Sequence, residues 1–407
     1  MPILYRFKST VLLLFLIGSS CKGQQKETIS NSEPSSEVPA PIKVAANRTE
    51  AYLPLLQGKK VGVVANPTSV IFKEQENTHL VDSLLSLGVH IKQVFAPEHG
   101  FRGTADAGEH VKDGVDTQTG LPIISLYGKN RKPSKEQLSD LDVVVFDIQD
   151  VGVRFYTFIA SLQLVMEACA ENDVPVIVLD RPNPNGHYVD GPTMMEEHTS
   201  YLGLNTIPLV YGMTMGEYAK MLNSEGWLEN GSKADLTVIE LENYTHESEY
   251  HLPIRPSPNL PNDTSITLYP SLGLFEGTNV NAGRGTEFQF QRYGASFMDS
   301  TAYDFSYVPE PNFGSKYPKE EGKTCYGRDL ADTPRMNEMT MQWIIDAYNN
   351  TLEKSNFFLT DGFTKHAGTP LLQKQIEEGL SNEEIKATWQ EDLEGFKKIR
   401  AKYLIYD

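Results

Sequence analysis

The segment 97–103 places several reactive side chains close together. Its sequence, PEHGFRG, offers the carboxyl of Glu98, the imidazole of His99 and the guanidinium of Arg102. A carboxylic acid with a raised pKa can protonate a leaving oxygen, as hydrolysis of a glycosidic bond requires. The apolar residues around Glu98 favour such a pKa, whereas helix capping or pairing with Arg102 would also suit this carboxylate. The segment makes Glu98 the first catalytic candidate, with His99 beside it.

Two further carboxylates lie in the segment 146–158, FDIQDVGVRFYTF. Strand residues alternate sides, so Asp147 should point differently from its apolar neighbours. Asp150 comes just past the predicted strand, where a helix can begin. Either aspartate could be the second catalytic carboxylate. The alternatives are an arginine partner for Asp147 and an N-cap role for Asp150.

Two loops carry groups that suit the binding of a polar sugar. LDRPNPNG is stiffened by two X-Pro bonds, and EGTNVNAGRGTEF places amides and a guanidinium among glycines. Such groups match the hydrogen bonds of an N-acetyl group and of a carboxylate. A solvent-exposed turn is the alternative for the second loop. The candidate binding residues are Arg181, Asn183, Glu276, Asn279 and Arg284.

Other chemistries have weaker support in the sequence. A metal could use carboxylates and imidazoles from Glu98, His99, His110, Asp147 and Asp150, but no HxH or HExxH spacing occurs. The first predicted strand runs into NPTS, so the glycines of a dinucleotide site are missing, and no GxSxG elbow is present. We therefore expect neither a metal nor a cofactor.

The elements that must position these residues alternate in type along the first half. Strands are expected at 60–65, 90–95, 123–126, 143–148 and 174–179, and helices at 78–87, 134–141 and 156–171. Continuous Val/Ile runs between helices predict a parallel sheet with helices on both faces, a Rossmann-like α/β domain. Ligands of such sheets bind beyond the carboxyl ends of the strands. Asn66 and Tyr127 follow two of these strands, so they join Glu98 as site candidates.

The second half changes in character after about residue 199. It has a helical pattern at 215–222, a strand pattern at 236–241 and a Pro/Asn-rich passage at 252–262. Near the end, Ser381 and Glu384 form a capping-box pattern before an apolar stripe at helical spacing. We predict a Rossmann-like catalytic domain at 46–200 and a smaller α+β domain at 201–407 that closes the cleft.

The first residues have the pattern of an export signal. Arg6 and Lys8 precede an apolar run, and small residues lead into Cys21. This ending resembles the lipobox of bacterial lipoproteins, which predicts a signal peptide at 1–21 and a lipidated Cys21; plain cleavage is the alternative. The polar segment 22–45 is expected to be a flexible tether. We expect an exported, periplasmic or outer-membrane-attached lipoprotein, held to the membrane by its lipid.

The overall charge limits the partners of this protein. The formal net charge is −18, which argues against binding nucleic acid through a basic surface. An acidic protein that binds an anionic ligand must supply its positive charge locally. The arginines near the predicted site therefore matter for any such ligand.

Five of these motifs, in this order, resemble one family, the exo-β-N-acetylmuramidases. They are PEHGFRG, FDIQDVGVRFYT, LDRPNPNG, RPSPNLP and LFEGTNVNAGRGT, and the similarity runs from about Leu53 to the final LIYD. The resemblance implies a Rossmann-like domain joined to a smaller domain, with the active site between them. It also implies release of terminal N-acetylmuramic acid (MurNAc) from the non-reducing end of peptidoglycan fragments such as MurNAc-GlcNAc. The glutamate of PEHG, here Glu98, would be catalytic.

The implied substrate sets a requirement for positive charge. MurNAc is N-acetylglucosamine (GlcNAc) with a lactyl ether, so it is anionic at neutral pH, and a bidentate arginine is its natural partner. The candidates, in order, are Arg284, Arg181, Arg154 and Arg102. Two alternatives remain open: a non-catalytic lipoprotein that binds muropeptides or sugars, and a metal-dependent hydrolase of another cell-envelope substrate.

Overall fold

The computed structural model describes residues 40–74, 76–103 and 113–407, and one compact unit extends from Pro41 to Asp407. The predicted signal peptide at 1–21, its Cys21, most of the predicted tether and His110 lie outside the described residues. In the part of the chain that the structure describes, no helix has the length and apolar character needed to cross a membrane.

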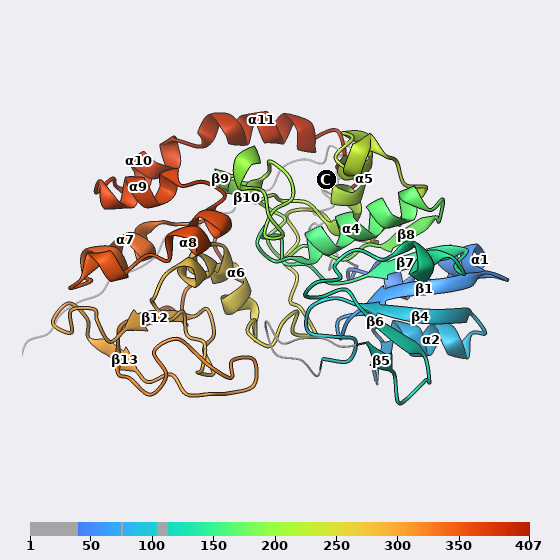
Figure 1. The fold of residues 1–407 in the computed structure, drawn as a ribbon, viewed down its shortest axis with the longest axis horizontal. Coiled ribbons are helices and arrows are strands. Elements are labelled where there is room, and N and C mark those ends of the chain that lie inside the picture. Colours follow the sequence, from blue (N-terminus) through green and yellow to red (C-terminus); the bar gives the residue numbers. More distant parts are fainter. Residues whose placement is uncertain (1–39, 75, 104–112) are drawn as a thin grey trace, which may run out of the picture. The chain divides into compact units, whose positions relative to one another are not determined.

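A seven-stranded sheet forms the first half of this unit (Figure 1), with the strand order β11-β8-β7-β1-β4-β6-β5. Neighbouring strands pair in parallel, except that β5 runs antiparallel to β6 at one edge. The predicted parallel sheet is confirmed, with one antiparallel edge strand added. The strands are β1 Lys60–Ala65, β4 His90–Ala96, β5 Gly114–Val115, β6 Pro122–Ser125, β7 Val143–Asp147, β8 Val176–Leu179 and β11 Leu236–Ile239.

Both faces of this sheet are buried, because successive strand residues point to opposite sides. Val64 and Val144 belong to the core that contains α4 and α5. Val63 and Val145 belong to the core that contains α1 and α2. This alternation confirms the predicted helices on both faces and explains the continuous apolar strands. The helices are α1 Thr49–Leu56, α2 Leu80–Ser86, α3 Lys135–Leu138, α4 Phe158–Glu171 and α5 Met215–Ser224.

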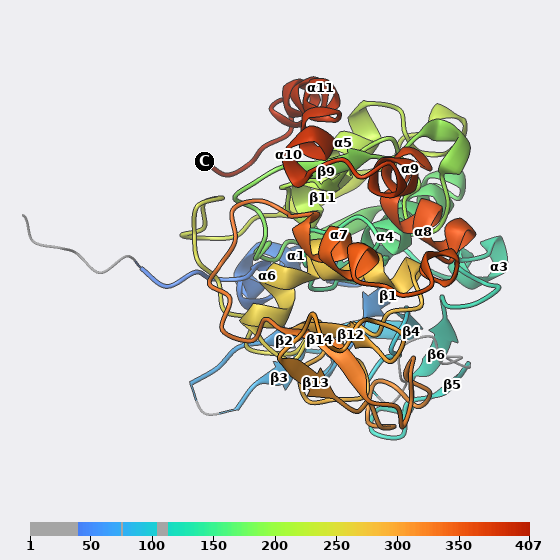
Figure 2. The ribbon, with the colours of Figure 1, turned by 90° about the vertical axis from the view of Figure 1, so that its left-hand side faces the viewer.

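The second half is a smaller α+β arrangement in which helices lie beside a three-stranded antiparallel sheet (Figure 2). The sheet has the order β12-β14-β13, and α6 and α7 lie on one side of it. Its elements are α6 Asp263–Leu272, β12 Arg292–Ala295, β13 Phe305–Tyr307, β14 Cys325–Asp329, α7 Gln342–Asn349, α8 Thr360–Ala367 and α9 Leu371–Glu377. Two small pairs complete the strands: β2 Val70–Ile71 with β3 Thr78–His79, and β9 Asp190–Thr193 with β10 Pro208–Val210.

The two halves are interleaved along the chain. β11 extends the large sheet although it comes from the stretch predicted for the second domain, and the boundaries predicted at 45 and 200 stay predictions. The capping box of Ser381 and Glu384 is confirmed, but the apolar stripe after it spans two helices, α10 Asn382–Ala387 and α11 Gln390–Arg400. α11 then contacts β9 and β10, so the last helix packs back onto the first half.

Arg154 connects the two halves from the loop between β7 and α4. Its side chain is fully buried, and its terminal nitrogens donate to four backbone carbonyls at 2.7–3.1 Å. Two carbonyls belong to the β9–β10 region and two to the end of α8, where the helix dipole favours a cation. They are the carbonyls of Pro192, Ile207, His366 and Ala367. Arg154, a predicted substrate ligand, is therefore committed to the backbone.

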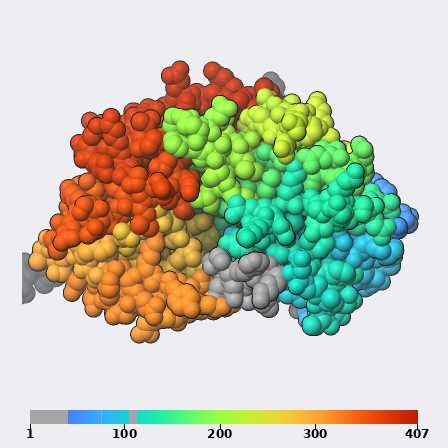
Figure 3. Space-filling view, in the orientation of Figure 1, coloured from blue at the N-terminus to red at the C-terminus, as the bar shows by residue number. Residues whose placement is uncertain are grey.

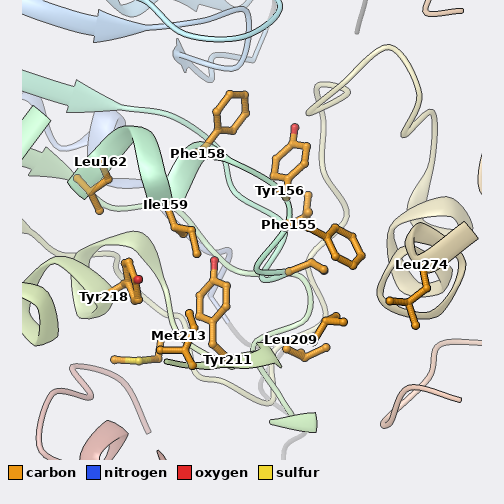
Figure 4. Packing of buried hydrophobic residues seen from close by; sticks show 14 of the residues in the cluster. Phe155, Tyr156, Phe158, Ile159, Leu162, Leu209, Tyr211, Met213, Tyr218 and Leu274 are labelled. Carbon is orange, nitrogen blue, oxygen red and sulfur yellow. The ribbon is translucent and has the colours of Figure 1, made fainter. Parts of the chain in front are cut away.

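Asp150, from the same loop, is buried in the core. It accepts hydrogen bonds from the hydroxyl of Tyr211 and from the amide of Gly152. Figure 4 shows Tyr211 among the apolar residues that pack against α4. Burial raises the pKa of Asp150 to about 7, although both hydrogen bonds favour the ionised form. Since α4 begins at Phe158, Asp150 is not its N-cap.

We predict that Arg154→Met destabilises the fold by about 3 to 5 kcal/mol, because several buried carbonyls lose their donor at once. Chemical denaturation of the purified protein measures this free energy. The matched control is Arg328→Met, which breaks an ion pair with Asp346 on a half-exposed side chain and should cost about 0 to 1 kcal/mol. Equal losses in the two variants would contradict the proposed role of Arg154.

The raised pKa of Asp150 also predicts a dependence of stability on pH. Asp150 is protonated in the folded state up to about pH 7, whereas in the unfolded chain it ionises near the ordinary aspartate pKa of 3.8. The unfolded state therefore binds fewer protons between these values, and stability falls as the pH rises from about 4 to 7. Asp150→Asn should reduce this pH-dependent decrease in the free energy of unfolding by as much as about 4 kcal/mol. Asp392→Asn, on the exposed side of α11, should leave the denaturation midpoints at each pH unchanged.

Candidate active site

A cavity of about 410 Å³ lies where the ends of the large sheet meet the second half of the chain. From the first half, Glu98 follows β4, Tyr127 follows β6 and Thr157 precedes α4. From the second half, the wall is formed by α6, the end of α8 and the 3-10 helix η4, Gly273–Gly277. Figure 3 shows the teal, green, gold and orange-red parts of the chain meeting on the face toward the viewer. This position agrees with the predicted cleft.

Glu98 and Tyr127 form one wall of the cavity. Glu98 is half-buried, and the hydroxyl of Thr157 donates to its Oε2 at 3.4 Å. Burial and the neighbouring Glu98 carboxylate raise the pKa of Tyr127, so its hydroxyl stays protonated and can donate a hydrogen bond to Glu98. His99, with a φ of 70°, is buried and is not part of the cavity wall. Glu98 is thus oriented by two hydroxyl groups and faces the cavity.

A second carboxylate, that of Glu276, lines the same cavity from η4. Its Oε1 lies 3.1 Å from Nε of Arg284. Burial opposes ionisation, but the charges of Arg284 and Lys319 outweigh it and lower the pKa of Glu276. The Nζ of Lys319 also donates to three backbone carbonyls around η4, which fixes this segment. Glu276 is therefore an ionised carboxylate held in place by its cations.

Aromatic rings connect the two carboxylate-bearing walls. The ring of Phe155 meets the ring of Tyr269 edge-on, with 5.1 Å between the ring centres. The ring of His366 also contacts Phe155, with 5.5 Å between the ring centres. Figure 4 shows Phe155 pointing toward the segment that carries Leu274. A Cβ at Gly273 would lie 2.4 Å from the Phe155 ring, so glycine permits this close approach. The contact brings η4, and with it Glu276, up to the loop that follows β7.

Asp147 and Arg181 lie elsewhere, in a fully buried ion pair with each other. Nε of Arg181 is 2.6 Å from Oδ1 of Asp147, and its second nitrogen is 2.9 Å from Oδ2. Arg181 also donates to the carbonyl of Val70 at 3.0 Å. Neither side chain lines the cavity, so the geometry matches the alternative of an arginine partner for Asp147. Asp150 likewise lies in the core rather than in the cavity wall.

The side chains of the other predicted binding residues bind groups of the protein outside the cavity wall. Arg102 forms ion pairs with Asp82 and Asp116. The side-chain amide of Asn183 donates to Met213, and that of Asn279 donates to Asn356. The side-chain Oδ1 of Asn66 accepts hydrogen bonds from the amide and the hydroxyl of Thr68. Of the predicted residues, the structure brings to the cavity Glu98, Tyr127, Glu276 and Arg284.

Several residues of the cavity wall were not predicted from the sequence. Phe155 and Thr157 lie within a motif that was singled out for its aspartates, and Tyr269 lies in the segment LYPSLG. Arg131 comes four residues after Tyr127 in the same strand-end loop, which is a signal that could have identified it. Tyr201 and His366 belong to segments without a recognisable pattern, and long-range packing brings them to the cavity.

No group of three or more His, Cys, Asp or Glu side chains is arranged to hold a metal ion within the described ranges.

Comparisons with known proteins agree with this site and fold. Residues 61–264 match the family model of the exo-β-N-acetylmuramidase NamZ N-terminal domain, and residues 267–406 match that of its C-terminal domain. The chain is 38% identical over 380 residues to the peptidoglycan β-N-acetylmuramidase NamZ of Bacillus subtilis strain 168, covering 87% of this chain and 89% of that protein.

Two solved structures of DUF1343 family proteins from Bacteroides fragilis have the same fold. One is 42% identical with a TM-score of 0.83, and the other is 27% identical with a TM-score of 0.76. Each comparison covers 90% of this chain and 99% of the other. Both family models and the relative from Bacillus subtilis lead to one conclusion: this chain belongs to the family of exo-β-N-acetylmuramidases.

Proposed function

We propose that this protein is a glycosidase that releases terminal MurNAc from the non-reducing end of peptidoglycan fragments such as MurNAc-GlcNAc. The observation that carries the proposal is the placement of two carboxylates, Glu98 and Glu276, on different walls of one cavity. Glycoside hydrolases use such a pair around the bond that they break. The family relationship supplies the substrate class, and the cavity supplies groups that suit it.

The two carboxylates have different surroundings, which suggests different roles. Glu98 has the hydroxyl groups of Thr157 and Tyr127 as neighbours. It transfers a proton to the leaving oxygen as the bond from that oxygen to C1 breaks. Glu276 stays ionised beside Arg284, so its charge favours the cationic, oxocarbenium-like transition state. Water then supplies the hydroxyl group at C1 and returns a proton to Glu98.

We further propose that the chain is exported and attached to a membrane by a lipid on Cys21. The support is the basic start at Arg6 and Lys8, the apolar run at 11–17 and the small residues before Cys21. A protein that degrades fragments of the cell wall would meet its substrate in that compartment. A periplasmic or outer-membrane position follows from the same pattern.

The hydrolysis itself is tested with purified protein and MurNAc-GlcNAc, with the products identified by mass spectrometry. Wild type should release free MurNAc, and a chelator should not change the rate. Glu98→Gln should lower kcat/KM by about 10² to 10⁴, since it cannot donate the proton. Glu276→Gln should also lower it, whereas Glu394→Gln, an exposed carboxylate on α11, should not.

Three results would contradict parts of this proposal. Binding of the disaccharide without any product would favour the sugar-binding lipoprotein. Loss of activity with a chelator, restored by added metal, would favour the metal-dependent hydrolase. Full activity of folded Glu98→Gln would keep the enzyme and reject Glu98 as its acid.

The lipid anchor is tested with the full chain expressed in a bacterium that processes lipoproteins. Wild type should partition into the detergent phase and incorporate labelled fatty acid. Cys21→Ser should be recovered in the aqueous phase without label, because its side chain lacks the thiol that is acylated. Identical partitioning of the two proteins, with no label in either, would reject the anchor and favour plain cleavage.

A further inference from the structure

We propose that Arg131 binds the lactyl carboxylate of the substrate and so determines the preference for MurNAc over GlcNAc. This inference rests on the proposed function and assigns a specificity residue to it. Arg131 was not among the arginines that the sequence pointed to. Its position in the cavity wall, its stacking on Tyr201 and the unpaired hydrogen-bond donor at its Nε carry the inference.

Arg131 is held in place by stacking on Tyr201. The central carbon of its guanidinium lies 4.0 Å from the centre of the Tyr201 ring, and both residues line the cavity. The hydroxyl of Tyr201 shares a hydrogen bond of 2.9 Å with Ser161 on α4, so the ring is anchored to a buried helix. A stacked guanidinium keeps its donors in the plane parallel to the ring, where they can reach a carboxylate bidentately.

One donor of Arg131 has no protein partner among the described residues. Its Nε is buried without a hydrogen-bond partner. Nε of Arg284 also lacks a well-formed hydrogen bond, but it lies 3.1 Å from the carboxylate of Glu276, and Arg181 is paired with Asp147. A buried donor without a partner is destabilising, and an arriving carboxylate would remove this penalty. Arg131 is therefore oriented so that it can bind an anionic ligand.

Arg131 also lies in the same electrostatic environment as Glu98. The pKa of Tyr127 is raised by burial and by Glu98, while Arg131 lowers it, so both charges act on this phenol. The pKa of Tyr201 is raised by burial and responds to the same two charges with the same signs. In MurNAc the lactyl group is on C3 and the bond to be broken is at C1 of the same ring. An acid and a cation that share one small cavity match this substrate.

The other cations of the cavity fit this role less well. Arg284 already neutralises Glu276, so moving it to a ligand would leave that carboxylate unpaired. Lys365 is exposed, and an ammonium group on a flexible chain is a well-hydrated point charge with little directional preference. Strong discrimination requires a fixed partner that is left unsatisfied by the wrong sugar. Arg131 meets this requirement.

The test is a double-mutant cycle between Arg131 and the carboxylate. Wild type and Arg131→Met are assayed on MurNAc-GlcNAc and on the same disaccharide with the lactyl carboxylate converted to an amide. We expect Arg131→Met to lower kcat/KM about 10²-fold or more on the acid and far less on the amide. Arg131→Lys should recover part of the activity on the acid. Lys365→Met serves as the matched control. It should lower kcat/KM only slightly, and by the same factor on both substrates.

Two results would overturn the inference. Equal losses on the acid and the amide would show that Arg131 does not contact the carboxylate, and no loss on either would give the role to another residue. Thermal unfolding of each variant checks that it folds, and Arg131→Lys keeps the test decisive where Arg131→Met does not fold. If wild type hydrolyses neither substrate, the proposed function fails. Calorimetry then compares the affinities of wild type and Arg131→Lys for MurNAc and GlcNAc, which tests the role of Arg131 independently of hydrolysis.

Discussion

The four hydrogen bonds from Arg154 to backbone carbonyls hold the two halves of this protein together at the cavity. The guanidinium is fully buried, and its partners are peptide carbonyls instead of a carboxylate. Its neighbours in the chain are Phe155 and Thr157, which line the cavity, and its acceptors include His366, which lines it from the other half. This side chain thereby ties the loop that carries Phe155 and Thr157 to the end of α8 that carries His366.

The cavity also shows how an acidic protein can bind an anion. With a formal net charge of −18, the protein's average field repels a carboxylate, and only charges close to the ligand can reverse this repulsion. The cations in and around the cavity act on different groups. Arg284 and Lys319 act on Glu276, and Arg131 remains available to a ligand. A carboxylate for chemistry and a cation for recognition can then share a cavity without neutralising each other.

Much of the large sheet could be predicted from the sequence, since parallel strands buried on both faces leave continuous Val/Ile runs. The predicted strand at 60–65 matches β1 residue for residue, and α3 lies within the helix predicted at 134–141. Glu98 and Tyr127 were placed at the site because strand ends converge on one edge. The break between α10 and α11 was missed, because the apolar spacing continues through Thr388 and Trp389 while the backbone does not.

The arginines illustrate what local patterns leave undetermined. Arg181 and Arg102 lie in motifs beside plausible catalytic groups, yet they pair with Asp147 and with Asp82 and Asp116. Whether an arginine is available depends on partners that are distant in sequence, and the local pattern around the arginine does not reveal them. His366 reaches the cavity only through the packing of α8 against η4, which has no signature in its own segment.

Asp180, at the end of β8, has a consequence for how the chain assembles. Its backbone carbonyl accepts from the amide of Ala45, and its carboxylate accepts from the hydroxyl of Tyr406 at 2.7 Å. Partners that are separated by most of the chain thus meet at one residue. Closing such long loops is costly in entropy and slow, and it cannot occur before the last helix is present. The end of β8 therefore gains its last hydrogen-bond partner only once the C-terminal residues are in place.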